Sequence, residues 1–273
     1  MIDDVGDIVS FYNNDPDREH LRLEQHRLEY DLTWRYFEHF LPPQGSILEL
    51  GAATGRYTLE LARRGYSITA VDMSKVLLGQ CAKRIAEEGL GDRVKFVLAD
   101  ARDLSQVAHK SFDAVLLMGP LYHLVVKTDR QLAINQAFAL LKDNGLLFSS
   151  FISRFGIFGD LMGDHPEWIE NQAEVRSILE VGKDPGLLPH AGFRGYFARA
   201  DEVALLHEEL GFETLIVAGV EPAIAAEDES YNRLTGNWRR QWLDLLFEIS
   251  TEPSILGASR HLLYIGRKPN RQG

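Results

Sequence analysis

The hydrophobic pattern along the chain alternates between two kinds of segment. Short, nearly continuous apolar runs are typical of buried strands, and they occur at 46–50, 66–71, 94–100, 112–118, 146–153, 212–220 and 261–266. Segments with apolar residues at helical spacing lie between them, at 55–64, 74–88, 128–141 and 200–210. We therefore expect an α/β fold with a doubly wound, Rossmann-like sheet of seven mostly parallel strands and helices on both faces.

Three further segments flank this pattern. Apolar and aromatic residues at helical spacing run from about 11 to 40 and stop at a Pro-Pro pair, so residues 1–43 are predicted to form a cap of one or two helices. Residues 44–273 then form the main domain. The alternation of apolar runs and helical segments becomes irregular at about 154–199 and 223–257, and we expect insertions there. Segments of this kind in open sheets lie over the edge where ligands bind, so the first is predicted to be a substrate lid.

The ends of the first three predicted strands carry acidic residues. Glu49 lies at the end of the first strand and precedes a turn with Gly51 and Gly55, while Asp72 and Asp100 end the next two strands. A single such turn or aspartate is often only structural. Because the carboxyl ends of parallel strands meet at one edge of a sheet, however, the three acids in this order predict a nucleotide pocket.

The turn after the first strand indicates which class of nucleotide the pocket binds. The dinucleotide fingerprint needs glycine at positions 51, 53 and 56, where this chain has Gly, Ala and Arg, so the turn argues against NAD. A pyrophosphate prefers bare N–H groups, whereas an ammonium and a sulfonium prefer a carboxylate such as Glu49. Asp72 lies 21 residues beyond Gly51, where an acid can accept hydrogen bonds from ribose hydroxyls in either class.

Several motifs resemble the class I S-adenosylmethionine (SAM) dependent methyltransferases, in particular bacterial enzymes of the UbiE-like, small-molecule type. The resemblance covers about residues 25 to 266, and the chain departs from the family at Ala53, where glycine is usual. The motifs are Glu49 with Gly51 to Gly55, Leu41-Pro42-Pro43, Gly55-Arg56-Tyr57, Leu61 to Tyr66, Asp72-Met73-Ser74 and Met118 to Leu124.

The resemblance implies SAM as the cofactor and S-adenosylhomocysteine as the product. We expect no metal, because no Cys/His cluster in the sequence has zinc-ligand spacing. An N-terminal arginine or tyrosine often binds the SAM carboxylate in similar enzymes, which makes Arg27 and Tyr12 candidates, although Arg27 fits a surface ion pair equally well. The other cofactor-binding residues that the resemblance implies are Glu49, Gly51, Ala53, Gly55, Asp72, Met73, Asp100, Ala101, Met118 and Gly119.

Methyl transfer from a sulfonium is an in-line displacement that mainly needs alignment and the exclusion of water. If the acceptor must lose a proton, His123 is the first candidate for the base and Tyr122 the second. His123 fits equally well as a histidine that shapes the turn. The candidate substrate contacts lie in the first insertion, where aromatic residues can also form a small core of their own. They are Phe155, His165, Trp168, His190 and Tyr196.

Composition narrows the possible functions. The net charge of −11 argues against nucleic acid as a partner, because phosphate binding needs clustered Lys and Arg. Cys81 is the only cysteine, which rules out an internal disulfide. No apolar run approaches the roughly 18 to 20 residues of a membrane span, and the N-terminus does not look like a signal peptide. We therefore expect a soluble, cytoplasmic protein.

The function predicted from the sequence is transfer of the SAM methyl group to an O, N or C atom of a small or medium organic acceptor. Two alternatives stay open. One is a tRNA or rRNA methyltransferase on the same fold, which would need a basic groove leading to the site. The other is a non-catalytic SAM-binding protein, because a fold does not fix a function.

Overall fold

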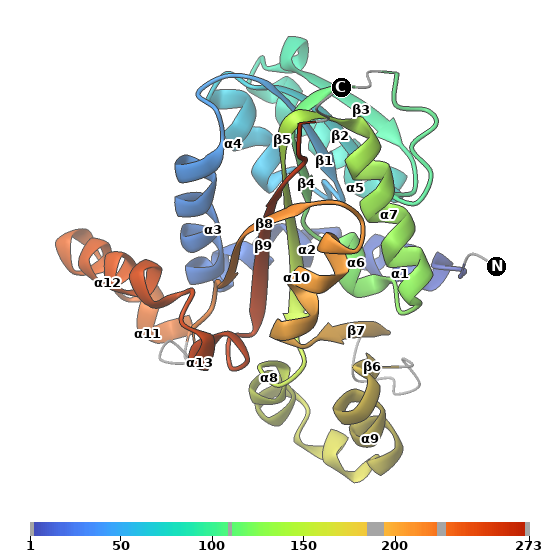
Figure 1. The fold of residues 1–273 in the computed structure, drawn as a ribbon. Helices are drawn as coiled ribbons and strands as arrows, with labels where there is room; N and C mark the ends of the chain where they lie inside the picture. The colour runs from blue at the N-terminus through green and yellow to red at the C-terminus, as the bar shows by residue number, and fades with distance from the viewer. Residues whose placement is uncertain (1–2, 109–110, 185–193, 223–227, 271–273) are drawn as a thin grey trace.

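A computed structural model describes residues 3–108, 111–184, 194–222 and 228–270. It is an α/β structure with a central sheet between two layers of helices (Figure 1). The strands are β1 (Ser46–Leu50), β2 (Ser67–Asp72), β3 (Val94–Leu98), β4 (Phe112–Leu117), β5 (Leu141–Ser153), β6 (Lys183–Asp184), β7 (Gly195–Ala198), β8 (Glu213–Gly219) and β9 (His261–Arg267).

The sheet confirms the predicted fold class. The strands β3, β2, β1, β4 and β5 are neighbours in that order and are all parallel. β9 pairs antiparallel with β5, and β8 pairs antiparallel with β9. The reversal of strand order beside β1 leaves a crevice at the carboxyl ends of β1 and β4, which is where open α/β sheets bind ligands.

The sequence predicts seven strands, and the structure adds two. The extra strands, β6 and β7, are short and lie within the segment expected to be an insertion. β7 extends the sheet by pairing with Ile152 and Ser153 at the end of β5. Two predicted strand boundaries differ from the structure by more than one residue. β3 ends at Leu98, so Asp100 lies in the loop beyond it, and β5 begins five residues early because it continues through a left-handed Asn144.

The N-terminal segment forms three helices, where one or two were predicted. The first break is at Asp15, directly before Pro16 begins the second helix, and the second is at His26, which precedes the third helix. These helices are α1 (Gly6–Asn14), α2 (Pro16–Gln25) and α3 (Arg27–Phe40). The helices that cover the sheet are α4 (Arg56–Arg63), α5 (Lys75–Glu87), α7 (Lys127–Leu140) and α10 (Ala200–Glu208), and a short α6 (Pro120–His123) follows β4.

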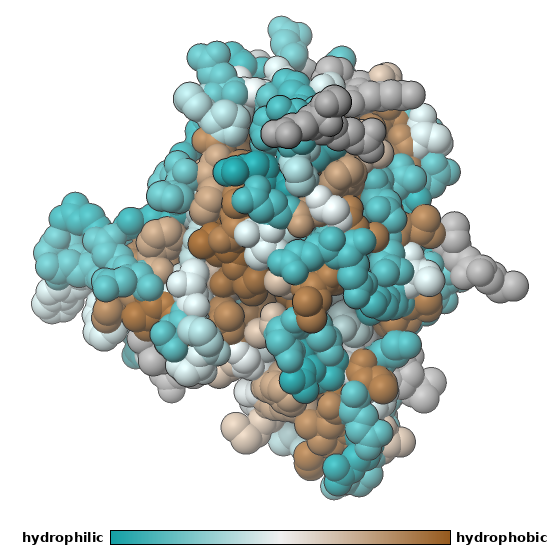
Figure 2. All heavy atoms as spheres, in the orientation of Figure 1, coloured by the Kyte–Doolittle hydropathy of each residue, from teal (hydrophilic) through white to brown (hydrophobic). Residues whose placement is uncertain are grey.

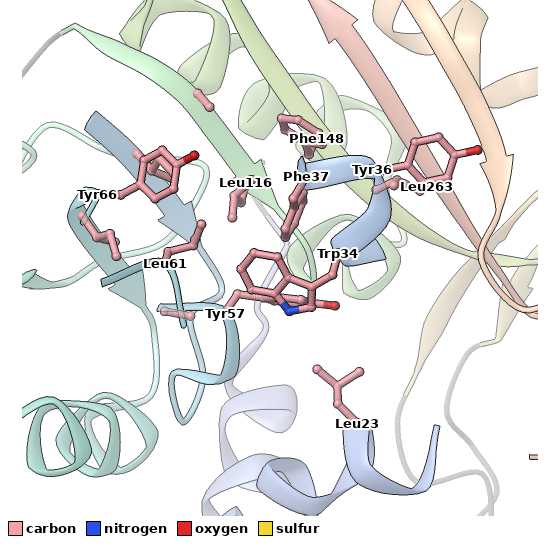
Figure 3. Packing of buried hydrophobic residues seen from close by; sticks show 14 of the residues in the cluster. Leu23, Trp34, Tyr36, Phe37, Tyr57, Leu61, Tyr66, Leu116, Phe148 and Leu263 are labelled. Atoms are coloured by element: carbon pink, nitrogen blue, oxygen red, sulfur yellow. The ribbon is translucent and has the colours of Figure 1, made fainter. Parts of the chain in front are cut away.

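Alternate residues of the strands face two separate hydrophobic layers. Ile47 of β1 belongs to the layer formed with α3, α4 and α5, and Leu48 belongs to the layer formed with α7 and α10. In the first layer the Phe37 ring meets Phe148 of β5 at 5.1 Å and Tyr57 of α4 at 5.4 Å between centroids (Figure 3). Burial of an aromatic ring of this kind contributes about 2 to 3 kcal/mol. These contacts hold α3 on the sheet and so place α1 and α2, which precede it.

Two groups of elements project from the sheet. The first is α8 (Ile157–Asp164), the 3-10 helix η2 (Pro166–Glu170) and α9 (Gln172–Val181), which share a small core around Trp168. The second is α11 (Asp228–Asn232), α12 (Gly236–Ile249) and α13 (Pro253–Leu256). Both bring hydrophobic residues to a largely hydrophilic surface (Figure 2), as Trp238 of α12 does. Among the residues that the structure describes, no helix is long and apolar enough to cross a membrane.

Candidate active site

The tips of β1 to β4 line one pocket. Nine of the residues predicted to bind the cofactor meet there, although they come from four different strands. We call this set the strand-tip wall. It consists of Glu49, Gly51, Ala53, Asp72, Met73, Asp100, Ala101, Met118 and Gly119.

A left-handed turn after β1 shapes the strand-tip wall. Gly51 and Gly55 have φ of 78° and 87°, and Ala53 has φ of 47°. A Cβ at Gly51 would lie 2.8 Å from Pro120, and one at Gly55 would lie 2.4 Å from the Cys81 sulfur. Both positions therefore require glycine. Gly55 does not line the pocket. It precedes α4 and supports the turn from behind.

Asp72 holds this turn in place. One carboxylate oxygen of Asp72 accepts the N–H of Ala53 at 2.8 Å, and the other accepts the N–H of Ser74 at 2.8 Å. The first bond fixes the left-handed alanine that departs from the family pattern. Burial raises the pKa of Asp72, and the backbone donors oppose that rise. Ser74 caps α5, as its hydroxyl accepts the Leu77 N–H at 3.0 Å, and the same hydroxyl donates to Asn13 of α1.

Glu49 is the most deeply buried acid of the strand-tip wall, with 2% of its surface exposed. The Thr58 hydroxyl donates to it at 2.6 Å. Burial raises the pKa of Glu49 to about 8. The Thr58 hydrogen bond opposes that rise and the nearby Asp72 adds to it. A cationic group of a ligand would favour the ionised form of this carboxyl, because an opposite charge at close range lowers the pKa of an acid.

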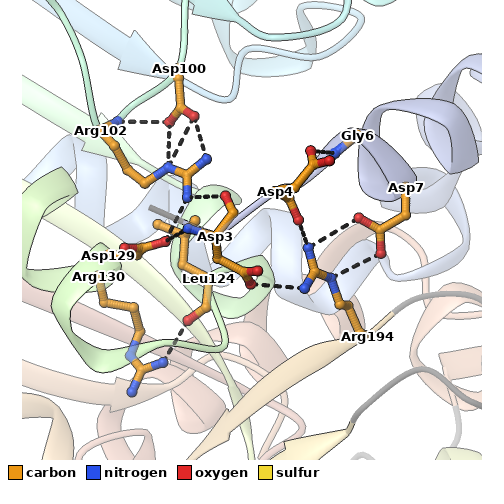
Figure 4. A network of polar contacts seen from close by, with 10 residues as sticks. All are labelled: Asp3, Asp4, Gly6, Asp7, Asp100, Arg102, Leu124, Asp129, Arg130 and Arg194. Carbon is orange, nitrogen blue, oxygen red and sulfur yellow. Dashed lines mark hydrogen bonds and ion pairs between the residues drawn. The ribbon is translucent and has the colours of Figure 1, made fainter. Parts of the chain in front are cut away.

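Asp100 is oriented by an arginine that the sequence reasoning did not identify. The Arg102 guanidinium donates to both carboxylate oxygens of Asp100, with Nη2 at 2.6 Å from Oδ2 (Figure 4). Its Nη1 also donates to Asp129 at 2.6 Å and to the Asp3 carbonyl at 2.8 Å. Arg194 binds Asp3 as well. The spacing Asp-x-Arg in the printed sequence is the signal that could have revealed this pairing.

The N-terminal helices form the opposite side of the pocket, which we call the helical wall. It consists of Val5, Ile8, Val9, Tyr12, Arg22 and Leu23. The predicted Tyr12 is part of it. The predicted Arg27 is not, since its side chain is 54% exposed and lies 3.9 Å from Asp31. The arginine that α2 contributes to the pocket is Arg22, which the sequence reasoning did not identify.

Both predicted catalytic residues lie on α6 and line the pocket. The His123 Nε2 atom lies 2.9 Å from the Tyr12 hydroxyl, which connects α6 to the helical wall. Burial, together with the positive charges of Arg194 and Arg22, lowers the pKa of His123 to about 3. The imidazole is therefore neutral at physiological pH. Tyr122 packs beside it, with 4.6 Å between the ring centroids.

The four predicted substrate residues of the first insertion that the structure describes do not line this pocket. Phe155 is 46% exposed, and Trp168 is buried and donates to Glu174 at 3.1 Å. His165 precedes η2. Tyr196 donates to Glu202 at 2.6 Å and lines a second cavity, together with Arg130, on the other layer of the sheet. His190 lies outside the described residues.

Among the described residues, one group of three side chains has atoms close enough to share a metal ion, within 4.8 Å of one another. It consists of Glu29, Glu221 and His261. Arg22 donates to Glu29 at 2.7 Å, and the Arg260 guanidinium lies 2.8 Å from Glu221. Because two guanidinium groups already neutralise these carboxylates, we assign the group an ionic role and no metal.

Comparison with known proteins agrees with this geometry. Residues 47–145 match the family model described as a methyltransferase domain. Methyltransferase GfsG of Streptomyces halstedii is 29% identical over 147 residues, which cover 54% of this chain and 51% of that protein. The chain spans about half the length of the curated relatives it matches.

Two solved structures share the fold across most of the chain. A SAM-dependent methyltransferase from Methanosarcina mazei has a TM-score of 0.60 at 19% identity, covering 86% of this chain and 97% of that one. The 1,6-didemethyltoxoflavin-N1-methyltransferase of Burkholderia thailandensis, with bound 1,6-didemethyltoxoflavin and S-adenosylhomocysteine, also has a TM-score of 0.60. It is 16% identical and covers 97% of this chain and 88% of that one. At these identities the likeness shows the fold alone.

Proposed function

We propose that this protein is a class I, SAM-dependent methyltransferase that binds SAM between the strand-tip wall and the helical wall, since residues 47–145 match the model of a methyltransferase domain. It then transfers the methyl group to a small or medium organic acceptor. The observation that carries the proposal is the convergence of Glu49, Asp72 and Asp100 on one pocket beside a left-handed turn.

The strand-tip wall offers a partner for each polar part of SAM. We assign Glu49 to the ammonium, because this carboxyl is buried, has a raised pKa and is bound by the neutral Thr58 hydroxyl. Asp72 is assigned to the ribose hydroxyls, and Asp100 with Ala101 to the adenine edge. Arg102 supports this role because it fixes the Asp100 carboxylate. Met73, which is 38% exposed and lines the pocket, is assigned to pack on the adenine ring.

The helical wall supplies a cation for the carboxylate of SAM. The sequence offers Arg27 for this role, whereas the pocket contains Arg22. A guanidinium binds a carboxylate through two parallel hydrogen bonds, which favours one orientation of the methionine part. We therefore assign the carboxylate to Arg22. Tyr12, the other candidate from the sequence, is assigned instead to position His123, which lies within hydrogen-bond distance of its hydroxyl.

Bound SAM supplies an electrophilic methyl group and a sulfide leaving group. The protein aligns the acceptor with it and excludes water, and the apolar residues of the helical wall suit the second task. His123 stays neutral at physiological pH because burial lowers its pKa to about 3, so it is a weak base. We propose that His123 and Tyr122 orient the acceptor by hydrogen bonding. This arrangement favours an acceptor that need not lose a proton before the transfer, such as a neutral amine, whose nitrogen attacks through its lone pair as the sulfide leaves.

A small organic acceptor fits the charge and the comparisons. The net charge of −11 disfavours an RNA substrate, and the Burkholderia thailandensis neighbour carries a small heterocyclic ligand. The first insertion, at about 154–199, stays a proposed lid for this acceptor. Its predicted contact residues that the structure describes, Phe155, His165, Trp168 and Tyr196, do not line the pocket. A cytoplasmic location and the division into residues 1–43 and 44–273 stay predictions from the sequence.

A labelling experiment tests the proposal against both alternatives. Purified protein is incubated with SAM carrying a labelled methyl group, with a small-molecule extract in one reaction and total RNA in another. We expect label in the small-molecule fraction, and its loss in the Asp72→Ala variant. Label that enters RNA would support the tRNA or rRNA alternative. SAM binding without any transfer would support the non-catalytic alternative.

A further inference from the structure

A buried ionic cluster lies directly behind the helical wall, outside the strand tips. It joins α2 and α3 to the end of the sheet formed by β8 and β9. None of its members was identified from the sequence. They are Arg22 of α2, His26 and Glu29 at the start of α3, Glu221 after β8, and Arg260 with His261 at the start of β9.

The cluster meets the pocket at Arg22. Its Nη1 donates to Oε2 of Glu29 at 2.7 Å, and its Nη2 donates to Oε1 at 3.1 Å. This two-point contact fixes the plane of the guanidinium as well as its position. A guanidinium has five N–H donors, so a contact that uses two of them is compatible with a second carboxylate. Arg22 lines the pocket, and 27% of its side chain is exposed.

The rest of the cluster holds Glu29. His261 Nδ1 lies 3.8 Å from Glu29 and bonds Glu221, and Arg260 lies 2.8 Å from Glu221. Burial alone would raise the pKa of Glu29, but Arg22 and His261 outweigh it and lower that pKa. Burial likewise opposes protonation of His261, and the two glutamates raise its pKa. The Glu29 carboxylate is therefore ionised and held from two sides.

We propose that Glu29 is a positioning residue, which fixes the Arg22 guanidinium at the pocket in the orientation that receives the methionine carboxylate of SAM. This inference rests on the proposed function. A long arginine side chain loses rotamer freedom when it binds a ligand, and a side chain already held by Glu29 loses less. Glu29 thus acts on SAM affinity through Arg22, without touching SAM.

A purely structural role makes a different prediction. If Glu29 only stabilised the packing of α2 and α3, its removal would weaken the binding of every ligand of the pocket to the same extent. If it acts through Arg22, only ligands with the methionine carboxylate are affected. S-adenosylhomocysteine has that carboxylate, whereas 5′-methylthioadenosine keeps the nucleoside and the sulfur but lacks the amino-acid part. This ligand pair separates the two roles.

The test is isothermal titration of both ligands into the wild type, Glu29→Gln, Arg22→Gln and the double variant. We expect Arg22→Gln to weaken the binding of S-adenosylhomocysteine by roughly 10-fold or more, and Glu29→Gln to weaken it by roughly 5-fold. The affinity for 5′-methylthioadenosine should change by less than about 2-fold in both. The double variant should bind no more weakly than Arg22→Gln alone, because two residues that act through one contact are not additive.

A matched control is Glu38→Gln, which removes the same charge from the same helix. Glu38 pairs with Arg64 at 2.9 Å on the surface, and we expect no change for either ligand. Should Glu29→Gln not fold, Glu29→Asp keeps the charge on a side chain one methylene shorter. It should weaken S-adenosylhomocysteine selectively, by less than Arg22→Gln does.

Three results would overturn the positioning role of Glu29, and a fourth would overturn the proposed function. Equal weakening of both ligands in the Glu29 variants would overturn the positioning role, and so would a double variant in which the two losses multiply. S-adenosylhomocysteine affinity that Glu29→Gln leaves unchanged would overturn it as well. Absence of binding of either ligand by the folded wild type would instead overturn the proposed function, so the two failures are distinguishable.

Discussion

The two walls of the pocket are built in different ways. The strand-tip wall comes from consecutive strand ends within 49–119, and its acids Glu49, Asp72 and Asp100 lie at these ends or just after them. The helical wall is held by contacts between distant parts of the chain, such as Asn13 with Ser74 and Tyr12 with His123. The residues that we propose to recognise SAM therefore follow from the order of the strands, whereas the surface that covers them depends on packing between distant segments.

The largest expected effect comes from the strand-tip wall. Asp72→Ala should weaken SAM binding by about 100-fold or more, which corresponds to about 2.7 kcal/mol. The substitution removes the proposed ribose acceptor and also the acceptor that holds the left-handed Ala53. Isothermal titration measures the loss, and Asp103→Ala, at an exposed aspartate nearby, is the control. Unchanged SAM affinity in Asp72→Ala would show that the strand-tip wall is not the SAM site.

Glu49→Gln should weaken the binding of SAM by roughly 30-fold, because a neutral amide replaces the carboxylate that is the proposed partner of the ammonium. The same substitution should also remove a pH dependence from the stability of the ligand-free protein. The folded protein keeps the Glu49 proton up to about pH 8, whereas the unfolded chain loses it near its ordinary value of 4.5. The folded state binds more protons between those values, so the stability of the ligand-free wild type falls as pH rises, by about 1.4 kcal/mol per unit at most.

Chemical denaturation at several pH values checks this second effect. Glu49→Gln should lack the fall in stability between about pH 4.5 and pH 8. Wild-type SAM affinity should rise over the same interval, since the ammonium binds the ionised carboxyl. A wild type and a Glu49→Gln variant with parallel stability profiles would show that Glu49 does not carry a raised pKa.

The helical wall predicts a contrast between two nearby arginines. Arg22→Gln should weaken SAM by about 10-fold, whereas Arg27→Gln should change its affinity by less than about 2-fold. The reason is that Arg22 lines the pocket and Arg27 makes an exposed contact with Asp31. Titration of both variants under one set of conditions measures the contrast. The reverse order of effects would restore the sequence-based assignment of Arg27.

The smallest expected effect on SAM comes from the first insertion. Trp168→Ala removes the centre of the small core shared by α8, η2 and α9, and it should destabilise that core by about 3 kcal/mol. SAM affinity should stay within about 2-fold of the wild type, because this core meets the pocket at Tyr122 and contains no residue of the strand-tip wall or the helical wall. Thermal denaturation and titration report the two quantities. A large loss of SAM affinity would show that the insertion contributes to the cofactor site.

The sequence was sufficient to predict those parts of the fold and the site that depend on the local pattern of residues. The turn at Gly51 to Gly55 and the acids at Glu49 and Asp72 could be placed because apolar runs mark buried strands and glycines mark the turns. The strands β6 and β7 could not be placed in the same way, since they lie in a segment without a regular pattern.

The arginines show the limit of sequence reasoning most clearly. Arg22 and Arg27 are five residues apart and lie on two separate helices, so only the break at His26 and the packing of α2 decide which one reaches the pocket. Arg102 was missed for a related reason. Arg102 and Asp100 are two residues apart in the sequence, but the contact of Arg102 with Asp3 forms only when the N-terminus has folded onto the sheet.

The central claim is that this pocket is a SAM site, and ligand selectivity tests it most directly. The purified protein is titrated with SAM and S-adenosylhomocysteine, with NAD and ATP as controls. The account predicts selective binding of the first two, with a Kd in the micromolar range, and no binding of the controls. Binding of NAD or ATP alone, or of none of the four, would contradict the assignment of Glu49, Asp72 and Asp100.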